Sequence, residues 1–159
     1  MIMKQYIQAA VLALCATFAV GAAAQTAAPA KAQTAAAPKA KAKAPAKNKV
    51  VFQVSDGDAA KWNLALNNVK NVQDELGASK VAIEIVAYGP GIGMLKADAT
   101  TSNRISDAIK SGIKIVACEN TMTNQKLTKA DMNPDIGYVP AGVVELMKRQ
   151  REGWAYVRP

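Results

Sequence analysis

The chain has 159 residues and a formal net charge of +8, from 20 Lys and Arg against 12 Asp and Glu. This length is enough for one domain and no more. Histidine is absent, which excludes a Ser-His-Asp triad, a Cys-His pair and any histidine-ligated metal. We therefore expect no metal site and no cofactor.

The positive charge is concentrated near the amino terminus. From Val50 to Pro159 there are nine Lys and four Arg against twelve acidic residues, a net charge of +1. Most of the excess comes from six lysines at positions 31, 39, 41, 43, 47 and 49. The folded part is therefore nearly neutral, and we expect no specific binding of nucleic acid.

Residues 1–24 have the pattern of a signal peptide. A positively charged start that contains Lys4 precedes an apolar stretch from Ala9 to Val20. Small residues then lead to a cleavage site after about Ala24. We expect a periplasmic protein, and the alternative is an uncleaved leader that tethers the chain to the inner membrane. Cleavage would also remove Cys15 and leave Cys118 as the one cysteine.

Residues 25–48 are rich in Ala, Lys and Pro and contain almost no large apolar side chain. Three prolines and repelling like charges predict a disordered tether. Two interpretations of its lysines remain open. The tether either adheres to an anionic surface of the cell envelope or serves as a solubilising spacer.

Residues 49–159 begin with a strand–helix–strand pattern. A buried strand is expected over 49–54, and Ser55 and Asp56 follow it in a loop. A helix is expected over 59–76, with one apolar face and Gly77 as its stop. The next strand is expected over 80–88. This order indicates a parallel sheet with helices on its faces.

A glycine-rich loop, Gly89-Pro90-Gly91-Ile92-Gly93, follows the second strand. Its backbone amides could crowd toward a small anion or a neighbouring side chain. Pro90 and the spacing do not fit a dinucleotide-binding fingerprint. The alternative is a tight turn that requires positive φ.

The stretch from 113 to 122 is the centre of the prediction. A third strand over 113–118 ends on Cys118, and Asn120 and Thr121 are good helix N-cap residues. The carboxyl end of a strand is where open α/β sheets bind ligands, and a helix start stabilises a thiolate. The neighbouring carboxylate of Glu119 acts against this, because a nearby negative charge raises the pKa of a thiol. We expect a thiol that solvent can reach, with a pKa below that of a free cysteine; the alternative is an inert, buried cysteine.

Two more strands and three more helices complete the domain. A helix is expected from Thr101 or Ser102 to Gly112, a short helix over 121–127, a strand over 136–139, a helix over 141–151 and a terminal strand over 154–158. The fold class is a three-layer α/β/α domain with a five-stranded, mainly parallel sheet. The periodic pattern of apolar residues is weak between residues 119 and 140. Its apolar residues are expected to need a neighbouring subunit: Met122, Leu127, Met132, Ile136 and Tyr138.

Five motifs together resemble the DsrE/DsrF-like family, in its exported single-domain branch. They are V-S-D-G-D (54–58), K-W-N-L-A-L-N-N (61–68), A-Y-G-P-G-I (87–92), V-A-C-E-N-T-M (116–122) and Y-V-P-A-G-V-V-E-L (138–146). The resemblance covers 49–159. It implies a five-stranded parallel sheet and oligomers of this unit. Cytoplasmic members of the family carry sulfur as a cysteine persulfide. The resemblance implies that Cys118 stands in the position of that cysteine.

The resulting hypothesis is a periplasmic sulfur-transfer protein that accepts sulfane sulfur on Cys118. It would be a carrier or transferase rather than a classical turnover enzyme, working with a donor or acceptor protein or a small thiol. The alternative is a non-catalytic oligomeric module that holds a small ligand over the glycine-rich loop, with Cys118 as packing. The residues expected to bind are Ser55, Asp56, Gly89, Gly91, Gly93, Glu119, Asn120 and Thr121.

Overall fold

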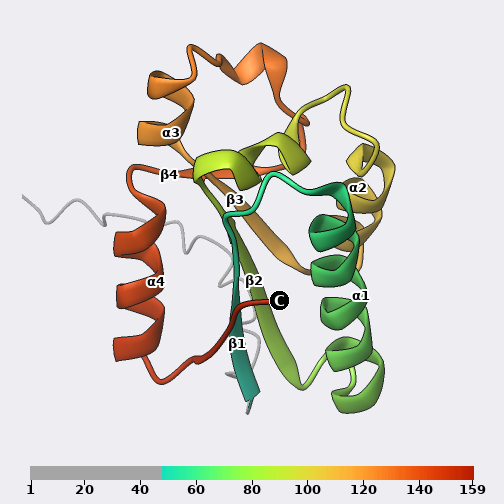
Figure 1. Cartoon of the computed structure of the whole chain (residues 1–159). Helices are drawn as coiled ribbons and strands as arrows, with labels where there is room; N and C mark the ends of the chain where they lie inside the picture. The colour runs from blue at the N-terminus through green and yellow to red at the C-terminus, as the bar shows by residue number, and fades with distance from the viewer. Residues whose placement is uncertain (1–47) are drawn as a thin grey trace, which may run out of the picture. The chain divides into compact units, whose positions relative to one another are not determined.

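The computed structural model describes residues 48–159 (Figure 1). The predicted signal peptide and nearly all of the predicted tether lie outside the described residues. Within the described part, no helix is both long and apolar enough to cross a membrane. In chain order the strands and helices are β1 (Asn48–Val54), α1 (Ala59–Leu76), β2 (Val81–Ala87), α2 (Ser102–Lys110), β3 (Lys114–Cys118), α3 (Glu119–Asn124), β4 (Gly137–Val139), α4 (Gly142–Arg151) and β5 (Ala155–Val157).

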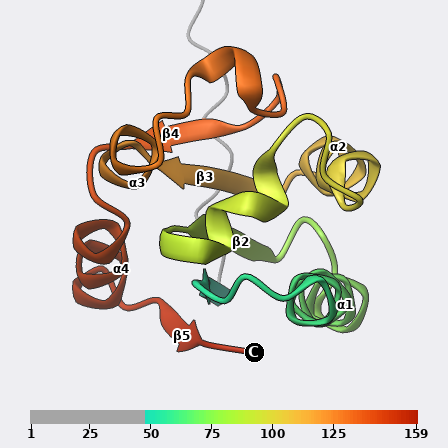
Figure 2. The ribbon, with the colours of Figure 1, turned by 45° about the horizontal axis from the view of Figure 1, so that its top comes forward.

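The five strands form one parallel sheet in the order β4-β3-β2-β1-β5. Ile85, in the middle of β2, pairs with Phe52 of β1 and Ile115 of β3. Helices α1 and α2 cover one face of the sheet, and α3 and α4 cover the other (Figures 1 and 2). The predicted three-layer α/β/α architecture is therefore confirmed.

The apolar core is unequal on the two faces. The face toward α1 and α2 carries a large cluster that includes Phe52, Ile85 and Ile115. The face toward α4 carries a small cluster with one helical member: Val51, Val86, Val116, Val139 and Leu146. Because side chains alternate along a strand, Cys118 shares the α4 face with Val116. The thiol thus lies on the face with the smaller apolar core.

The predicted elements agree closely with the structure, and two details differ. Helix α3 begins at Glu119, so Cys118 itself occupies the N-cap position that Asn120 or Thr121 was expected to fill. The expectation that the weakly patterned segment needs a neighbouring subunit is wrong, because this chain buries Met122, Met132 and Ile136 in its own large cluster. Leu127 and Tyr138 pack against the same cluster.

Two short 3-10 helical segments complete the carboxyl edge of the sheet. The glycine segment, Gly89–Leu95, follows β2, and Lys129–Asp131 precedes β4. Figure 2 shows the glycine segment lying over this edge, beside α3. The ends of β1, β2 and β3 therefore meet under one cap formed by the segments that follow them.

Candidate functional site

Cys118 is the last residue of β3 and the free cysteine of the described residues. Its side chain is only 5% exposed. The expectation of a solvent-reachable thiol is therefore contradicted in this conformation. The physical reason is that the turn from Pro140 into α4 closes over the strand end: the Cys118 Sγ lies 3.9 Å from the carbonyl oxygen of Pro140.

Two helix N-termini converge on the Cys118 sulfur. Helix α3 starts directly after it, and the backbone amides of Asn120 and Thr121 favour the negative form of the sulfur, which lowers its pKa. Helix α4 contributes the amide of Gly142, from a segment far along the chain. The Asn120 N–H also donates to the Pro140 carbonyl at 3.1 Å, which holds the two helix starts together. Free amides at helix starts stabilise negative charge, so the arrangement favours a thiolate.

The pKa of Cys118 reflects a competition between burial and hydrogen bonding. Burial alone raises the thiol pKa, because it penalises the charged form. The Thr121 hydroxyl and the amides of Gly142, Thr121 and Asn120 lower it, and together they prevail. The pKa is therefore held below its ordinary value, in the direction that the sequence predicted. A lowered pKa increases the fraction of the nucleophilic form at neutral pH.

Thr121 connects the thiol to the glycine segment. Its hydroxyl oxygen accepts a hydrogen bond from the Gly89 N–H at 3.0 Å, and the same hydroxyl lowers the pKa of the Cys118 thiol. Gln125 donates from Nε2 to the Gly89 carbonyl at 3.1 Å, one turn further along. Because the Thr121 oxygen is already an acceptor, its own proton can point at the sulfur. The hydroxyl is therefore available as a donor to a thiolate.

The three glycines of the segment have different neighbours. Gly89 has a φ of 53° and is the one tied to Thr121. A Cβ on Gly91 would lie 2.4 Å from the Val54 carbonyl oxygen, so its hydrogen side chain permits close packing on the end of β1. A Cβ on Gly93 would lie 3.0 Å from the Trp62 ring. Close packing and one positive φ account for these glycines, and the anion-binding role predicted for them stays a prediction.

Ser55 and Asp56 lie at the same edge of the sheet but after β1, and within the described residues no hydrogen bond or ion pair joins either of them to Cys118. The Ser55 hydroxyl accepts from Gln53 Nε2 at 3.0 Å. The Asp56 backbone carbonyl accepts from the Trp62 indole at 2.6 Å, and its carboxylate pairs with Arg158 at 3.5 Å. These two residues therefore belong to a polar group beside the thiol site.

Tyr88 follows β2 and lies close to both Ser55 and Gly142, and it was not among the predicted site residues. Burial raises its pKa, with a further contribution from Tyr156. The Tyr88 ring packs against Gly142, where an added Cβ would lie 3.0 Å from the ring carbon Cδ1. Tyr88 thus supports the start of α4.

Gly142 was also missed as a site residue. The signal available was Pro140, which marked the start of α4, but its closeness to Cys118 depends on the pairing of β3 with β4. Glu119, in contrast, is the first residue of α3. Of the residues predicted around the thiol, the structure therefore brings Asn120, Thr121 and Gly89 together.

The fold and site define an α/β protein with a parallel sheet and a thiol at a strand end beneath two helix starts. Residues 48–159 match the family described as the DsrE/DsrF-like family, and the chain belongs to it. This family is implicated in sulfur relay in general.

Three solved structures resemble the chain. A protein of unknown function, MTH1491 from Methanobacterium thermoautotrophicum, is 34% identical with a TM-score of 0.68 over 70% of this chain and 99% of its own. A conserved protein of unknown function, BT1422 from Bacteroides thetaiotaomicron, is 18% identical (TM-score 0.59, 70% and 95%). The ychN protein from E. coli is 7% identical with a TM-score of 0.57, over 72% of this chain and 99% of its own. The latter two show the fold alone. No curated protein matches the chain.

Proposed function

We propose that this protein carries sulfane sulfur as a persulfide on Cys118. The observation that supports the proposal is the set of donors around the sulfur: one hydroxyl and three amides lower the pKa of a thiol that burial alone would raise. A purely packing cysteine needs no such donors, because a neutral thiol is a weak hydrogen-bond acceptor. Membership of a family implicated in sulfur relay points in the same direction.

The transfer needs no external oxidant. The Cys118 thiolate attacks the outer sulfur of a donor persulfide, R–S–SH, and forms a new sulfur–sulfur bond. The donor's own sulfur–sulfur bond breaks, and the donor leaves as the thiolate R–S⁻, which takes up a proton from solvent. The same exchange in reverse passes the sulfur to an acceptor thiol. The amides and the Thr121 hydroxyl would hold the negative charge on the bound persulfide.

The test is mass spectrometry of the peptide that contains Cys118 after the protein is exposed to inorganic polysulfide. We expect this peptide to gain the mass of one or more sulfur atoms and to lose it again on treatment with a small thiol. Cys118→Ser is the matched control and should gain nothing at this position. An unmodified Cys118 peptide, from protein whose Cys118 alkylates after denaturation, would refute the proposal.

A second candidate function is the non-catalytic binding module, and the burial of Cys118 favours it. In that case the cysteine serves only packing, and a small ligand binds elsewhere. A groove of about 360 Å³ lies between α1 and α2, and Ile113 lines it at the opposite end of β3 from Cys118. The polysulfide experiment separates the two functions, because a packing cysteine would stay unmodified.

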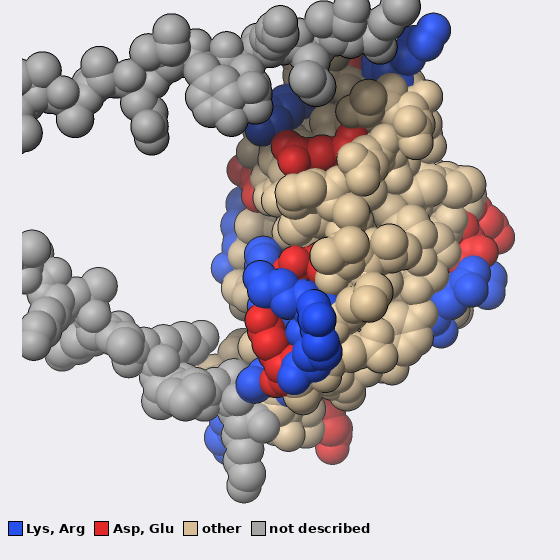
Figure 3. Space-filling model, turned by 90° about the vertical axis from the view of Figure 1, so that its left-hand side faces the viewer, with Lys and Arg blue, Asp and Glu red and all other residues tan. Residues whose placement is uncertain are grey.

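The proposal includes a periplasmic location, with the leader cleaved after about Ala24, and a homo-oligomer. Helix α4 offers a surface for self-association, because Val143, Val144 and Met147 are 51%, 54% and 57% exposed on it. Figure 3, which views this side of the molecule, shows a patch of mixed charge beside a broad uncharged area. We expect Met147→Lys to lower the mass that light scattering reports. A monomer at high micromolar concentration of the wild type would contradict the oligomer.

A further inference from the structure

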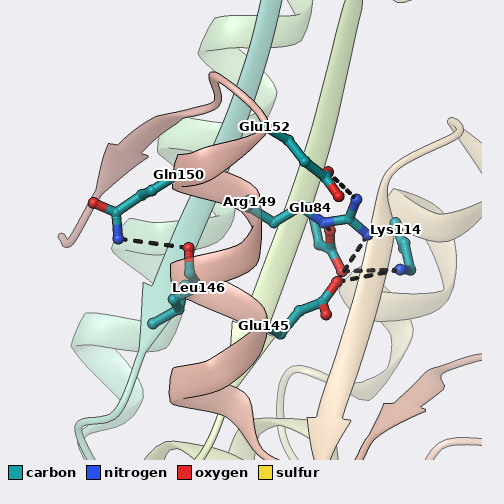
Figure 4. A network of polar contacts seen from close by, with 7 residues as sticks. All are labelled: Glu84, Lys114, Glu145, Leu146, Arg149, Gln150 and Glu152. Atoms are coloured by element: carbon teal, nitrogen blue, oxygen red, sulfur yellow. Dashed lines mark hydrogen bonds and ion pairs between the residues drawn. The ribbon is translucent and has the colours of Figure 1, made fainter.

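A group of five charged residues lies between the sheet and α4, and no step of the sulfur transfer uses it. Its centre is Glu84, in the middle of β2 and 0% exposed. Figure 4 shows Arg149 of α4 pointing at Glu84, with Lys114 of β3 approaching from the other side. The remaining two members, Glu145 and Glu152, also come from α4 or its end. We call these five residues the charge cluster.

Arg149 is held in one orientation by the charge cluster. Its Nε pairs with Glu84, its Nη2 lies 2.8 Å from Glu145 Oε1, and its Nη1 lies 3.0 Å from Glu152 Oε2. The guanidinium also lies over the Trp154 ring, 4.8 Å from its centroid. Lys114 completes the group at 3.0 Å from Glu84 Oε1. All three guanidinium nitrogens therefore have a carboxylate within ion-pair distance. Of these contacts only Nη1–Glu152 has the geometry of a hydrogen bond, so Glu84 and the Arg149 Nε attract each other as buried charges and not through an aligned hydrogen bond.

Such a cluster is a costly means of attaching a helix. Taking a charge out of water costs several kcal/mol, and well-packed apolar residues in its place often give equal or greater stability. Ion pairs instead restrict the relative position of the helix and the sheet, because the two charged groups attract each other most strongly at short distance. Apolar packing restricts the position of α4 less, because Leu146 is the one buried member of the small cluster that α4 contributes. The charge cluster thus determines where α4 sits along the sheet.

The position of α4 matters at its other end. Gly142 and Arg149 are seven residues apart on α4, so about 10 Å of rigid helix joins the charge cluster to the start of α4. At that start the Pro140 carbonyl oxygen lies 3.9 Å from the Cys118 Sγ, and the Gly142 amide favours the thiolate. A shift of α4 by a fraction of a turn would move that amide out of hydrogen-bonding range. We propose that the charge cluster, and the Glu84–Arg149 pair above all, is a positioning device that keeps the Gly142 amide aimed at the Cys118 sulfur.

The positioning role rests on the proposed function only in taking Cys118 as the working thiol. Its test is the titration of that thiol, followed by the ultraviolet absorbance of the thiolate, with Cys118→Ser subtracted at each pH. This readout requires neither a sulfur donor nor an accessible sulfur. Apart from Glu84 and Arg149, the elements that carry or flank Cys118 hold the titratable groups Tyr88, Lys114, Glu119, Tyr138, Glu145, Lys148 and Arg151, and the variants chosen leave these in place.

Two charge-neutral variants separate positioning from a long-range effect of charge. Arg149→Lys keeps the positive charge and loses the rigid fork, and Glu84→Leu combined with Arg149→Met removes both charges of the pair. We expect each to raise the midpoint of thiol titration by about half to one pH unit. Val69→Ala, which weakens the opposite face of the sheet, should lower stability and leave the midpoint unchanged.

The outcomes distinguish this inference from the proposed function. A wild-type midpoint in folded Arg149→Lys or in the folded double variant overturns the positioning role, whether or not Cys118 takes up sulfur. A raised midpoint in these variants, in a protein whose Cys118 takes up no sulfur from polysulfide, supports positioning and overturns the proposed function. A shift of the same size in Val69→Ala also overturns positioning, because general loosening would then explain it.

Discussion

Replacing Thr121 with valine removes one hydroxyl from beside the Cys118 sulfur and leaves a side chain of nearly the same shape. Thr121 is 9% exposed and Cys118 is 5% exposed, so water does not readily take the place of the lost group. The hydroxyl acts on two groups, because it lowers the pKa of the Cys118 thiol and accepts from the Gly89 N–H at 3.0 Å. Both interactions disappear in Thr121→Val.

The magnitudes follow from the two lost hydrogen bonds. A hydrogen bond to a charged group contributes about 1.5–3 kcal/mol, so the thiol pKa should rise by about one to two units. The Gly89 N–H is left without its acceptor, at a cost of about 1–2 kcal/mol in the free energy of unfolding. Thr121→Ser keeps the hydroxyl and should retain most of the wild-type pKa, which makes it the matched control.

The assay is thiolate absorbance against pH for the thiol and urea denaturation for stability. We expect the titration curve of Thr121→Val to move upward in pH and that of Thr121→Ser to stay close to wild type. If Thr121→Val loses stability and keeps the wild-type titration midpoint, then the hydroxyl serves Gly89 alone. The account of a hydroxyl that stabilises the thiolate would then be refuted.

Three further predictions concern the same edge of the sheet. Gly91→Ala should lower the free energy of unfolding by about 3 kcal/mol in urea denaturation, because its Cβ would meet the Val54 backbone at 2.4 Å. Gly142→Ala should raise the thiol pKa in the absorbance titration, because its Cβ would push Tyr88 and the start of α4 apart. Because folding lowers the Cys118 pKa, the stability of wild type relative to Cys118→Ser should rise with pH between the folded pKa and the unfolded value of about 8.5. That advantage should be lost as the pH falls through the folded pKa, and a pH-independent difference between the two unfolding curves would contradict this.

The helices and strands could be predicted from the sequence because the residues that start and end them lie within or next to them. Helix α1 runs over the predicted residues, and the Asp58 carboxylate caps it by accepting from the Ala60 N–H at 2.8 Å. Gly77 ends it with a φ of 85°. The parallel sheet followed from the alternation of strands and helices, because parallel strands need such crossovers. Each of these signals lies within a few residues of the structure that it predicts.

The site was predictable only in part, because much of it comes from distant segments. Asn120 and Thr121 follow Cys118 directly, and their contribution to the thiol could be inferred from helix-start chemistry. Gly142 reaches the sulfur through the fold of β4 and α4, which no local pattern encodes. Glu84 could have been noticed as a charge inside an apolar strand, but its partner Arg149 could not be identified from the pattern alone. The burial of the thiol was missed for the same reason as Gly142.

The direction of β1 has a practical consequence. The strand starts at Asn48 and ends at Val54, next to the edge where β3 ends in Cys118, and its seven residues extend over about 20 Å. Whatever is joined to the chain ahead of Asn48 therefore connects to the domain at the end opposite the thiol. A solid support, a fluorescent label or a lipid anchor attached at Asn48 would therefore be joined to the domain about 20 Å from the edge where Cys118 lies. The carboxyl terminus does not share this property, because β5 runs parallel to β1 and brings Arg158 to Asp56 at the thiol edge.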